Sequence, residues 1–364
     1  MAAGQQAGDA VFDALAFADD DRANLIREPR QPRRQRGIYI LVSHAPHVNS
    51  SHMTLAYFSH PDCRAHFMGR GHPECPERLD AIHDHLIATG LIDALDSREP
   101  PLATAEQLQR AHSGLHVAEL RAAMEPLTQS GAQVQIDPDT SAGPGSWQAA
   151  LRAAGAAVAA TDAVIDGSAR TAFCAVRPPG HHAERAAAMG FCFFNNVAVA
   201  ARHALDARGL QRVAVIDFDV HHGNGTEDIV AGDERMLMAS IVQHPLYPYS
   251  GGVPKGTNMV NVPIPPYGRG AQVREAIEAM WLPRLEEFKP QMLFVSAGFD
   301  AHREDELGQL GLVEDDYAWI TKQLVAVADK HAQGRIVSCL EGGYNLNALA
   351  RSVAAHLRVL AGLD

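Results

Sequence analysis

The sequence predicts an α/β protein in which a mostly parallel central sheet is flanked by helices on both faces. From residue 53 onward, segments with strand and helix patterns alternate along the chain. The strand segments are near-continuous apolar runs, which is typical of strands buried on both faces of a parallel sheet. The chain has 364 residues and 46% hydrophobic content, which is enough to bury the core of one such domain.

Residues 1–52 differ in composition from the rest of the chain. An acidic patch at residues 19–21 is followed by the proline-interrupted basic run "REPRQPRRQR". Segments of this kind usually stay solvated and unpacked. We therefore expect residues 1–52 to be a disordered N-terminal extension and residues 53–364 to form a single catalytic domain. The alternative is that the basic run is a functional arm that contacts nucleic acid or a partner.

Two helices are predicted before the first long strand. Residues 76–90 begin with a proline, end at Gly90 and carry apolar residues at helical spacing. Residues 146–167 form a long run rich in small residues, with Ser146 as candidate N-cap and Gly167 as the stop.

The rest of the chain alternates between the two kinds of element. The predicted strands cover residues 171–177, 212–220, 236–242, 291–299 and 335–343. The predicted helices cover residues 195–209, 270–288, 314–331 and 347–362. Several of these strands end in polar or turn-forming residues, and ligands of open α/β sheets bind at the carboxyl ends of the strands. We therefore expect the chemistry of the protein to gather there.

The stretch "VIDFDVHHGNGT", residues 215–226, carries the densest group of titratable residues. Asp217, Asp219 and His221 alternate, so they face one way if the strand continues. Asp300 ends another apolar strand. Asp219, His221 and Asp300 then give three ligands with a fourth position open, the pattern of catalytic zinc. The alternative is structural: Asp217 caps backbone amides and His221 is a hydrogen-bonded structural histidine.

Two further strand ends carry residues suited to proton transfer. His181 and His182 follow a Pro-Pro-Gly turn, and a histidine pair beside a metal can exchange protons near neutral pH. Tyr344 follows two glycines, and its hydroxyl could donate to a developing oxyanion. Between them, we expect Phe191 to line a pocket and Phe194 to lie in the core.

Composition argues against several classes of protein. A net charge of −12 disfavours nucleic-acid binding by the body of the chain. The five cysteines are scattered and lack CxxC spacing, so neither a disulfide framework nor a cysteine-ligated zinc site is expected. The sequence shows no membrane span or signal peptide, and we expect a soluble cytoplasmic protein. Cys192 is expected to serve packing, and a redox role for it or Cys75 stays open.

Six motifs occur in a familiar order: "GHPECPERL", "RPPGHHA", "GFCFFNN", "DFDVHHGNGT", "SAGFDAH" and "EGGYN". This set resembles that of the zinc-dependent histone deacetylase superfamily, over residues 53–364. Asn224 stands where the class I pattern has an aspartate, so the chain is most similar to the class II-like bacterial histone deacetylase-like amidohydrolases. The resemblance implies the arginase/deacetylase-like fold and hydrolysis of an acylated amine by attack of a zinc-bound water.

The resemblance also implies roles for individual residues. One zinc ion would be held by Asp219, His221 and Asp300. His182 would serve as general base and acid with Asn224 oriented toward it, His181 would pair with Asp217, and Tyr344 would polarise the amide carbonyl. The implied substrate-binding residues are Gly190, Phe191 and Tyr247. The implied ligands of a structural potassium ion are Asp217, Asp219, His221, Ser240 and Ile241. Arg78 would line an internal channel.

Departures from the family pattern bear on the substrate. Leu307 stands where polyamine-selective members carry a glutamate, and an insertion typical of acetylpolyamine enzymes is missing before "GHPECPERL". We therefore expect N-ε-acetyl-lysine in peptides or proteins as substrate, with acetylpolyamines as the alternative. Glu306 replaces a usual proline beside the matching Asp305, which leaves that loop's conformation open. Acyl-chain preference and oligomeric state are also open.

The sequence also leaves two other functions as alternatives. An arginase-like dinuclear manganese hydrolase would share the fold, but it needs further carboxylates where this chain has His302. A non-catalytic acyl-lysine binder would not need the retained histidine pair, Tyr344 and all three metal ligands.

Overall fold

The structure is a computed structural model that describes residues 55–364. The predicted extension, residues 1–52, and the predicted domain start at residue 53 lie outside the described residues. Residues 55–364 belong to one compact unit.

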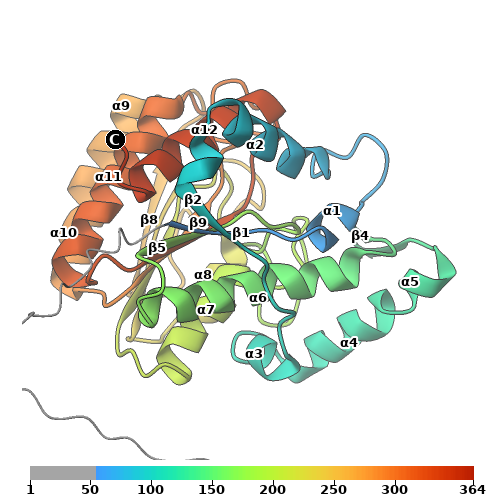
Figure 1. The fold of residues 1–364 in the computed structure, drawn as a ribbon. Helices are drawn as coiled ribbons and strands as arrows, with labels where there is room; N and C mark the ends of the chain where they lie inside the picture. Colours follow the sequence, from blue (N-terminus) through green and yellow to red (C-terminus); the bar gives the residue numbers. More distant parts are fainter. Residues whose placement is uncertain (1–54) are drawn as a thin grey trace, which may run out of the picture. The chain divides into compact units, whose positions relative to one another are not determined.

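Eight parallel strands form the central sheet, in the order β2-β1-β5-β10-β9-β6-β7-β8 (Figure 1). Their bounds are Leu55–Phe58 (β1), Leu95–Arg98 (β2), Thr171–Cys174 (β5), Val213–Asp217 (β6), Met236–Gln243 (β7), Met259–Ile264 (β8), Leu293–Ala297 (β9) and Ile336–Leu340 (β10). Six of these strands are fully buried along their length: β1, β5, β6, β7, β9 and β10. For the last five, the continuous apolar sequences predict this burial. The predicted parallel α/β fold is confirmed.

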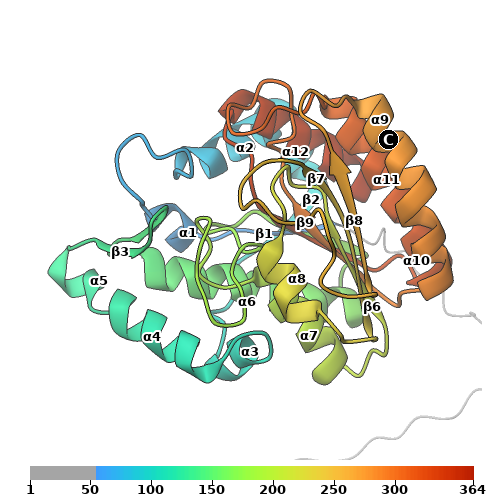
Figure 2. The same ribbon diagram turned by 180° about the vertical axis from the view of Figure 1, so that it is seen from behind.

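Helices cover both faces of the sheet (Figures 1 and 2). On one face α2 (Glu77–Ala88), α11 (Glu314–His331) and α12 (Leu346–Leu360) pack together. On the same side lie α9 (Gly270–Ala276) and α10 (Leu282–Phe288), joined by a π-helical segment. The other face is covered by α6 (Ser146–Ile165) and α7 (Asn196–Asp206), whose alanine-rich surfaces allow close packing.

A smaller apolar cluster lies beside α6 and α7, separate from the main core. Its elements are α3 (Ala105–Gln109), α4 (Gly114–Met124), α5 (Leu127–Ser130) and the antiparallel pair β3 (Val134–Asp137) and β4 (Thr140–Ala142). The remaining short helices are α1 (Asp62–Ala65), α8 (Asn224–Val230) and a 3₁₀ turn at Leu91–Ala94.

Two expectations about local structure are corrected, and three strands were missed. Ser146 does not cap α6, because Gly145 holds the cap position; the Ser146 hydroxyl accepts from the Gly143 amide and contacts His66 Nδ1. β6 ends at Asp217, so Asp219 and His221 lie in the following loop and not on a strand face. Strands β1, β2 and β8 were not predicted; β2 has the mostly polar sequence LDSR and β8 contains a proline.

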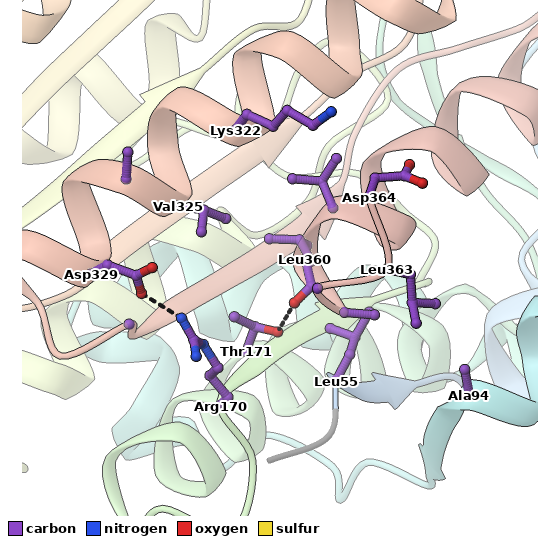
Figure 3. A pocket seen from close by; sticks show the side chains of 15 residues that line it. Leu55, Ala94, Arg170, Thr171, Lys322, Val325, Asp329, Leu360, Leu363 and Asp364 are labelled. Atoms are coloured by element: carbon purple, nitrogen blue, oxygen red, sulfur yellow. Dashed lines mark hydrogen bonds and ion pairs between the residues drawn. The ribbon is translucent and has the colours of Figure 1, made fainter. Parts of the chain in front are cut away.

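A hollow of about 790 Å³ lies at the amino ends of the strands (Figure 3). Leu55 and Thr171, the first residues of β1 and β5, line it, and an ion pair between Arg170 and Asp329 lies within it. It is therefore at the opposite edge of the sheet from the titratable strand ends. Within residues 55–364, no helix is long and apolar enough to cross a membrane.

Candidate metal and catalytic site

Three buried side chains converge at the carboxyl edge of the sheet. Asp219 and His221 come from the loop after β6, and Asp300 comes from the loop after the neighbouring strand β9. One donor atom from each lies within 4.8 Å of the others, the one such group among the described residues. His221 Nδ1 lies 3.2 Å from Asp219 Oδ1 and 3.1 Å from Asp300 Oδ2.

The backbone holds both carboxylates in place. Asp219 Oδ2 accepts from the amide of Gly342 at 2.8 Å, and Asp300 Oδ1 accepts from the amide of Val220 at 2.9 Å. A Cβ atom at Gly298 would collide with the Asp219 carboxylate. Glycine in "SAGFD" is therefore required for this approach.

The electrostatics of the three residues fit a bound cation. Burial and the adjacent Asp219 carboxylate raise the pKa of Asp300 to about 7. Burial lowers the pKa of His221, but hydrogen bonds to Asp219 and Asp300 outweigh it and raise that pKa to about 10. Two buried carboxylates this close are strained by like charge unless a cation lies between them. The nitrogen and oxygen donors match those that zinc takes in catalytic sites.

His181 lies beside Asp217, the partner that the family resemblance implies for it. His181 Nδ1 lies 3.1 Å from Asp217 Oδ2. Burial lowers the pKa of His181, but Asp219 and Asp217 outweigh this effect and raise that pKa well above its usual range. A protonated His181 balances part of the buried carboxylate charge.

The pKa of His182 is shifted in the opposite direction from that of His181. Its Nδ1 lies 2.8 Å from Asn224 Oδ1. The Asn224 amide nitrogen donates to Glu184 Oε1 at 2.9 Å, which orients the amide oxygen toward the imidazole. Burial, then His181 and His221, hold the pKa of His182 well below its usual range. His182 is therefore a neutral imidazole with a proton on Nδ1 and a basic Nε2.

Tyr344 is held in place by Asp305, which binds its backbone amide, and by the buried Arg78, which lies over its ring. Asp305 Oδ2 accepts from the amides of Tyr344 and Asn345 at 2.6 and 3.0 Å. The Arg78 guanidinium carbon lies 5.0 Å from the centre of the Tyr344 ring. Burial and the Asp300 carboxylate raise the pKa of Tyr344 well above its usual range, so the hydroxyl keeps its proton and can donate it.

Of these groups, His182, His221 and Tyr344 reach a pocket of about 290 Å³. It is lined by Asp139, His182, Gly190, Phe191, His221, Leu246, Tyr247, Leu307 and Tyr344. The Tyr247 ring centre lies 5.3 Å from that of His182, and the Phe191 ring centre lies 6.0 Å from that of Tyr344. Gly190, Phe191 and Tyr247 therefore lie together, while Phe194 is buried in the apolar cluster beside α6. Gly190 has φ +57°, and a side chain there would collide with the His182 ring.

Sequence reasoning missed Asp139. It lies between β3 and β4, where its Oδ1 accepts from the amide of Gly190 at 3.0 Å. The hydroxyl of the adjacent Thr140 accepts from the amide of Phe191 at 2.9 Å. The hairpin therefore shapes the pocket wall. Its strands are too short to leave a sequence signal, and only the turn-forming "DPD" marks the position.

The predicted potassium ligands lie on neighbouring segments. Asp217 on β6 and Ser240 on β7 are partners in the parallel register, and Ile241 follows Ser240. Asp219 and His221 follow Asp217 in the loop. The Ser240 hydroxyl lies 3.1 Å from Asn261 Oδ1, and no cation site is identified by these contacts alone.

Comparison with known proteins agrees with this geometry. A profile described as "Histone deacetylase domain" matches residues 72–360. "Histone deacetylase-like amidohydrolase" of Pseudomonas aeruginosa is 39% identical over 282 residues, covering 76% of this chain and 73% of its own length. "Polyamine deacetylase HDAC10" of Mus musculus is 37% identical over 308 residues, covering 79% of this chain and 45% of its own length.

A solved structure is also similar. "Crystal Structure of HDA15 HD domain" has a TM-score of 0.79 and 32% sequence identity, covering 86% of this chain and 89% of that one. The chain spans between 21% and 95% of the length of the curated relatives it matches. The 21% value is for "Type-2 histone deacetylase 2" of Dictyostelium discoideum, a relative of which this chain covers only that part.

Proposed function

The chain belongs to the histone deacetylase family of amidohydrolases, and on that premise we propose that it hydrolyses N-ε-acetyl-lysine in peptides or proteins. One observation carries the proposal. A neutral histidine, His182, and a protonated phenol, Tyr344, line one small pocket with His221 of the Asp-His-Asp group. These are a base, an oxyanion donor and a metal ligand, which amide hydrolysis requires together.

The metal belongs to the proposal. Zinc is expected for this family, and Asp219, His221 and Asp300 would hold one ion. When bound, zinc supplies Lewis acidity toward the amide carbonyl and lowers the pKa of a water molecule. A structural potassium ion held by Asp217, Asp219, His221, Ser240 and Ile241 is also proposed, supported by the pairing of Asp217 with Ser240.

Separate residues carry out proton transfer, charge stabilisation and exclusion of water. His182 Nε2 takes a proton from the attacking water and later delivers it to the departing amine, while Asn224 keeps Nδ1 protonated. His181, charged and paired with Asp217, stabilises negative charge nearby. The Tyr344 hydroxyl donates to the carbonyl oxygen as it becomes negative. Phe191 and Tyr247 exclude water from the acyl-lysine chain.

The pocket wall favours acyl-lysine over acetylpolyamine. Leu307, which lines the pocket, gives an apolar wall where a polycation would need a carboxylate. Asp139 is the one carboxylate in the lining, and it is engaged by the amide of Gly190. Polyamine deacetylation remains the alternative, because "Polyamine deacetylase HDAC10" is among the similar proteins.

A panel of acetyl-lysine peptides and acetylpolyamines tests the proposal, with release of free amine as the readout. We expect turnover of the peptides that a chelator abolishes and zinc restores. Turnover of polyamines alone would contradict the proposed substrate. Binding of acetylated peptide without release of acetate would show a non-catalytic binder.

A further inference from the structure

Glu341 is a fully buried carboxylate that the proposed mechanism does not use. It follows β10 directly. Its Oε2 accepts from the amides of Gly180 and His181 at 2.6 and 3.1 Å, and its Oε1 accepts from the Ser296 hydroxyl at 3.1 Å. Each carboxylate oxygen is therefore committed to a short polar contact inside the protein.

The two amides belong to the loop that presents the catalytic histidines. Residues 178–182 have no helix or strand, so these amides have no partner in a ladder of backbone hydrogen bonds. A buried amide without a partner costs free energy. Glu341 satisfies both amides with one oxygen atom, and Ser296 on β9 fixes the other oxygen to the sheet.

The turn that begins at Glu341 also contacts Asp219 and carries Tyr344. The amide of Gly342 donates to Asp219 at 2.8 Å, and Tyr344 follows two residues later. Arg78 donates to the carbonyl oxygens of Glu341 and Gly343 at 2.5 and 2.7 Å. The turn at residues 341–344 therefore contacts a metal ligand, carries the phenol and, through the Glu341 side chain, holds the histidine loop.

We propose that Glu341 is a positioning residue that fixes His181 and His182 relative to Tyr344. The inference rests on the proposed function, in which His182 and Tyr344 act on the same amide group. Displacement of a reacting group by about 1 Å can cost on the order of 100-fold in rate. The side chain of Glu341 has the length and the two acceptors needed to set that spacing.

Two conservative variants of Glu341 distinguish an effect of its hydrogen-bonding geometry from an effect of its charge. In Glu341→Gln the amide oxygen can still accept from Gly180 and His181, and the amide nitrogen can donate to Ser296 Oγ. Glu341→Asp keeps the charge, but it is one methylene too short to hold both partners. Ser338→Ala is the matched control, because Ser338 is a buried polar residue on β10, the strand that Glu341 follows, and it contacts His356 instead of the histidine loop.

Three readouts are compared for each variant: kcat and KM on an acetyl-lysine peptide, zinc content, and hydrogen exchange of the segment 178–183. We expect Glu341→Asp to lower kcat on the order of 10- to 100-fold, with KM and zinc content unchanged and with faster exchange at residues 180 and 181. Glu341→Gln and Ser338→Ala should keep a kcat and an exchange pattern close to those of the unmodified protein.

The opposite order of activity, with Glu341→Asp active and Glu341→Gln impaired, would overturn the inference in favour of a role for the charge. The inference would also be overturned if Glu341→Asp had the same kcat as the unmodified protein, or if hydrogen exchange at residues 180 and 181 were unchanged in that variant. An unmodified chain that hydrolyses none of the acylated amines would refute the proposed function instead. In that case the exchange measurements on the two variants still decide whether Glu341 holds the loop.

Discussion

The amide oxygen of Asn224 lies 2.8 Å from Nδ1 of His182. The Asn224 nitrogen faces Glu184 and Met189, so the amide cannot turn without losing both contacts. This arrangement selects one tautomer of a neutral imidazole and leaves its second nitrogen as a base. An aspartate at the same position would instead stabilise the imidazolium.

Asn224→Asp should move the acidic limb of the pH profile. A carboxylate beside His182 raises the pKa of that imidazole, so the base becomes protonated at a higher pH than in the unmodified protein. The acidic limb of kcat/KM should therefore shift to higher pH, as measured by peptide deacetylation across the pH range. Asn224→Leu, the control, should lower kcat without this shift, and an unmoved limb in Asn224→Asp would contradict the assignment of His182 as base.

Tyr344→Phe should abolish most turnover and leave the fold intact. Removal of one oxyanion donor typically costs on the order of 100- to 1,000-fold in kcat. Zinc content and the urea unfolding midpoint should match those of the unmodified protein, since the backbone contacts of Tyr344 with Asp305 do not involve the hydroxyl. A variant with near-normal turnover would show that Tyr344 does not stabilise the oxyanion.

Leu307→Glu should change substrate preference. A carboxylate at the pocket wall attracts the remaining ammonium groups of an acetylpolyamine. The ratio of kcat/KM for acetylspermidine to that for an acetyl-lysine peptide should rise, and the rise should weaken at high salt. Leu307→Gln is the neutral control of the same length. An equal change in the two variants would mean that charge is not the cause.

Glu74→Gln should destabilise the protein. Glu74 is buried between Arg177 and Arg78, and Arg177 Nη2 donates to it at 2.6 Å. Loss of the carboxylate leaves a buried guanidinium without its counter-charge, which typically costs about 3–5 kcal/mol of unfolding free energy. Urea unfolding at pH 7 measures this loss. Glu125→Gln, which removes an exposed partner of Arg121, is the control and should have no clear effect.

The effect of Glu74→Gln should depend on pH in a defined direction. Burial alone would raise the pKa of Glu74, but Arg177 outweighs it and holds that pKa at about 2, below the ordinary 4.5. A depressed pKa contributes stability above the ordinary value, and this contribution is lost as the pH falls toward 2. The difference in unfolding free energy between the two proteins should therefore shrink below about pH 4.5. A difference that stays constant would contradict the ion pair.

The sheet and the candidate metal-binding group could be predicted from sequence because both leave local patterns. Continuous apolar runs identify β6, β9 and β10, and the residues that end them lie at one edge of a parallel sheet. The expectation that Asp219 and His221 share a strand face was wrong, since β6 ends at Asp217. Asp219 and His221 lie close to Asp300 because backbone amides and the close approach of Gly298 fix the loop. Alternation of side chains along a strand does not produce this arrangement.

The rest of the site depends on contacts between residues distant in sequence. Asp139 reaches Gly190 from a hairpin of two short strands, and Glu341 reaches Gly180 across 161 positions. The isolated stretches around Asp139 and Glu341 contain no period or spacing that specifies these partners. The conformation of the loop at Asp305 was likewise open from the sequence, and in the structure the Asp305 carboxylate accepts from the amide of Tyr344.

Metal titration of the stripped protein tests the central claim most directly. The chain is freed of metal with a chelator and titrated with zinc, while bound metal and deacetylation of an acetyl-lysine peptide are followed together. Activity should rise from zero and level off at one zinc per chain, and Asp300→Asn should bind zinc more weakly. Activity that persists without metal, or that needs two manganese ions per chain, would contradict the account.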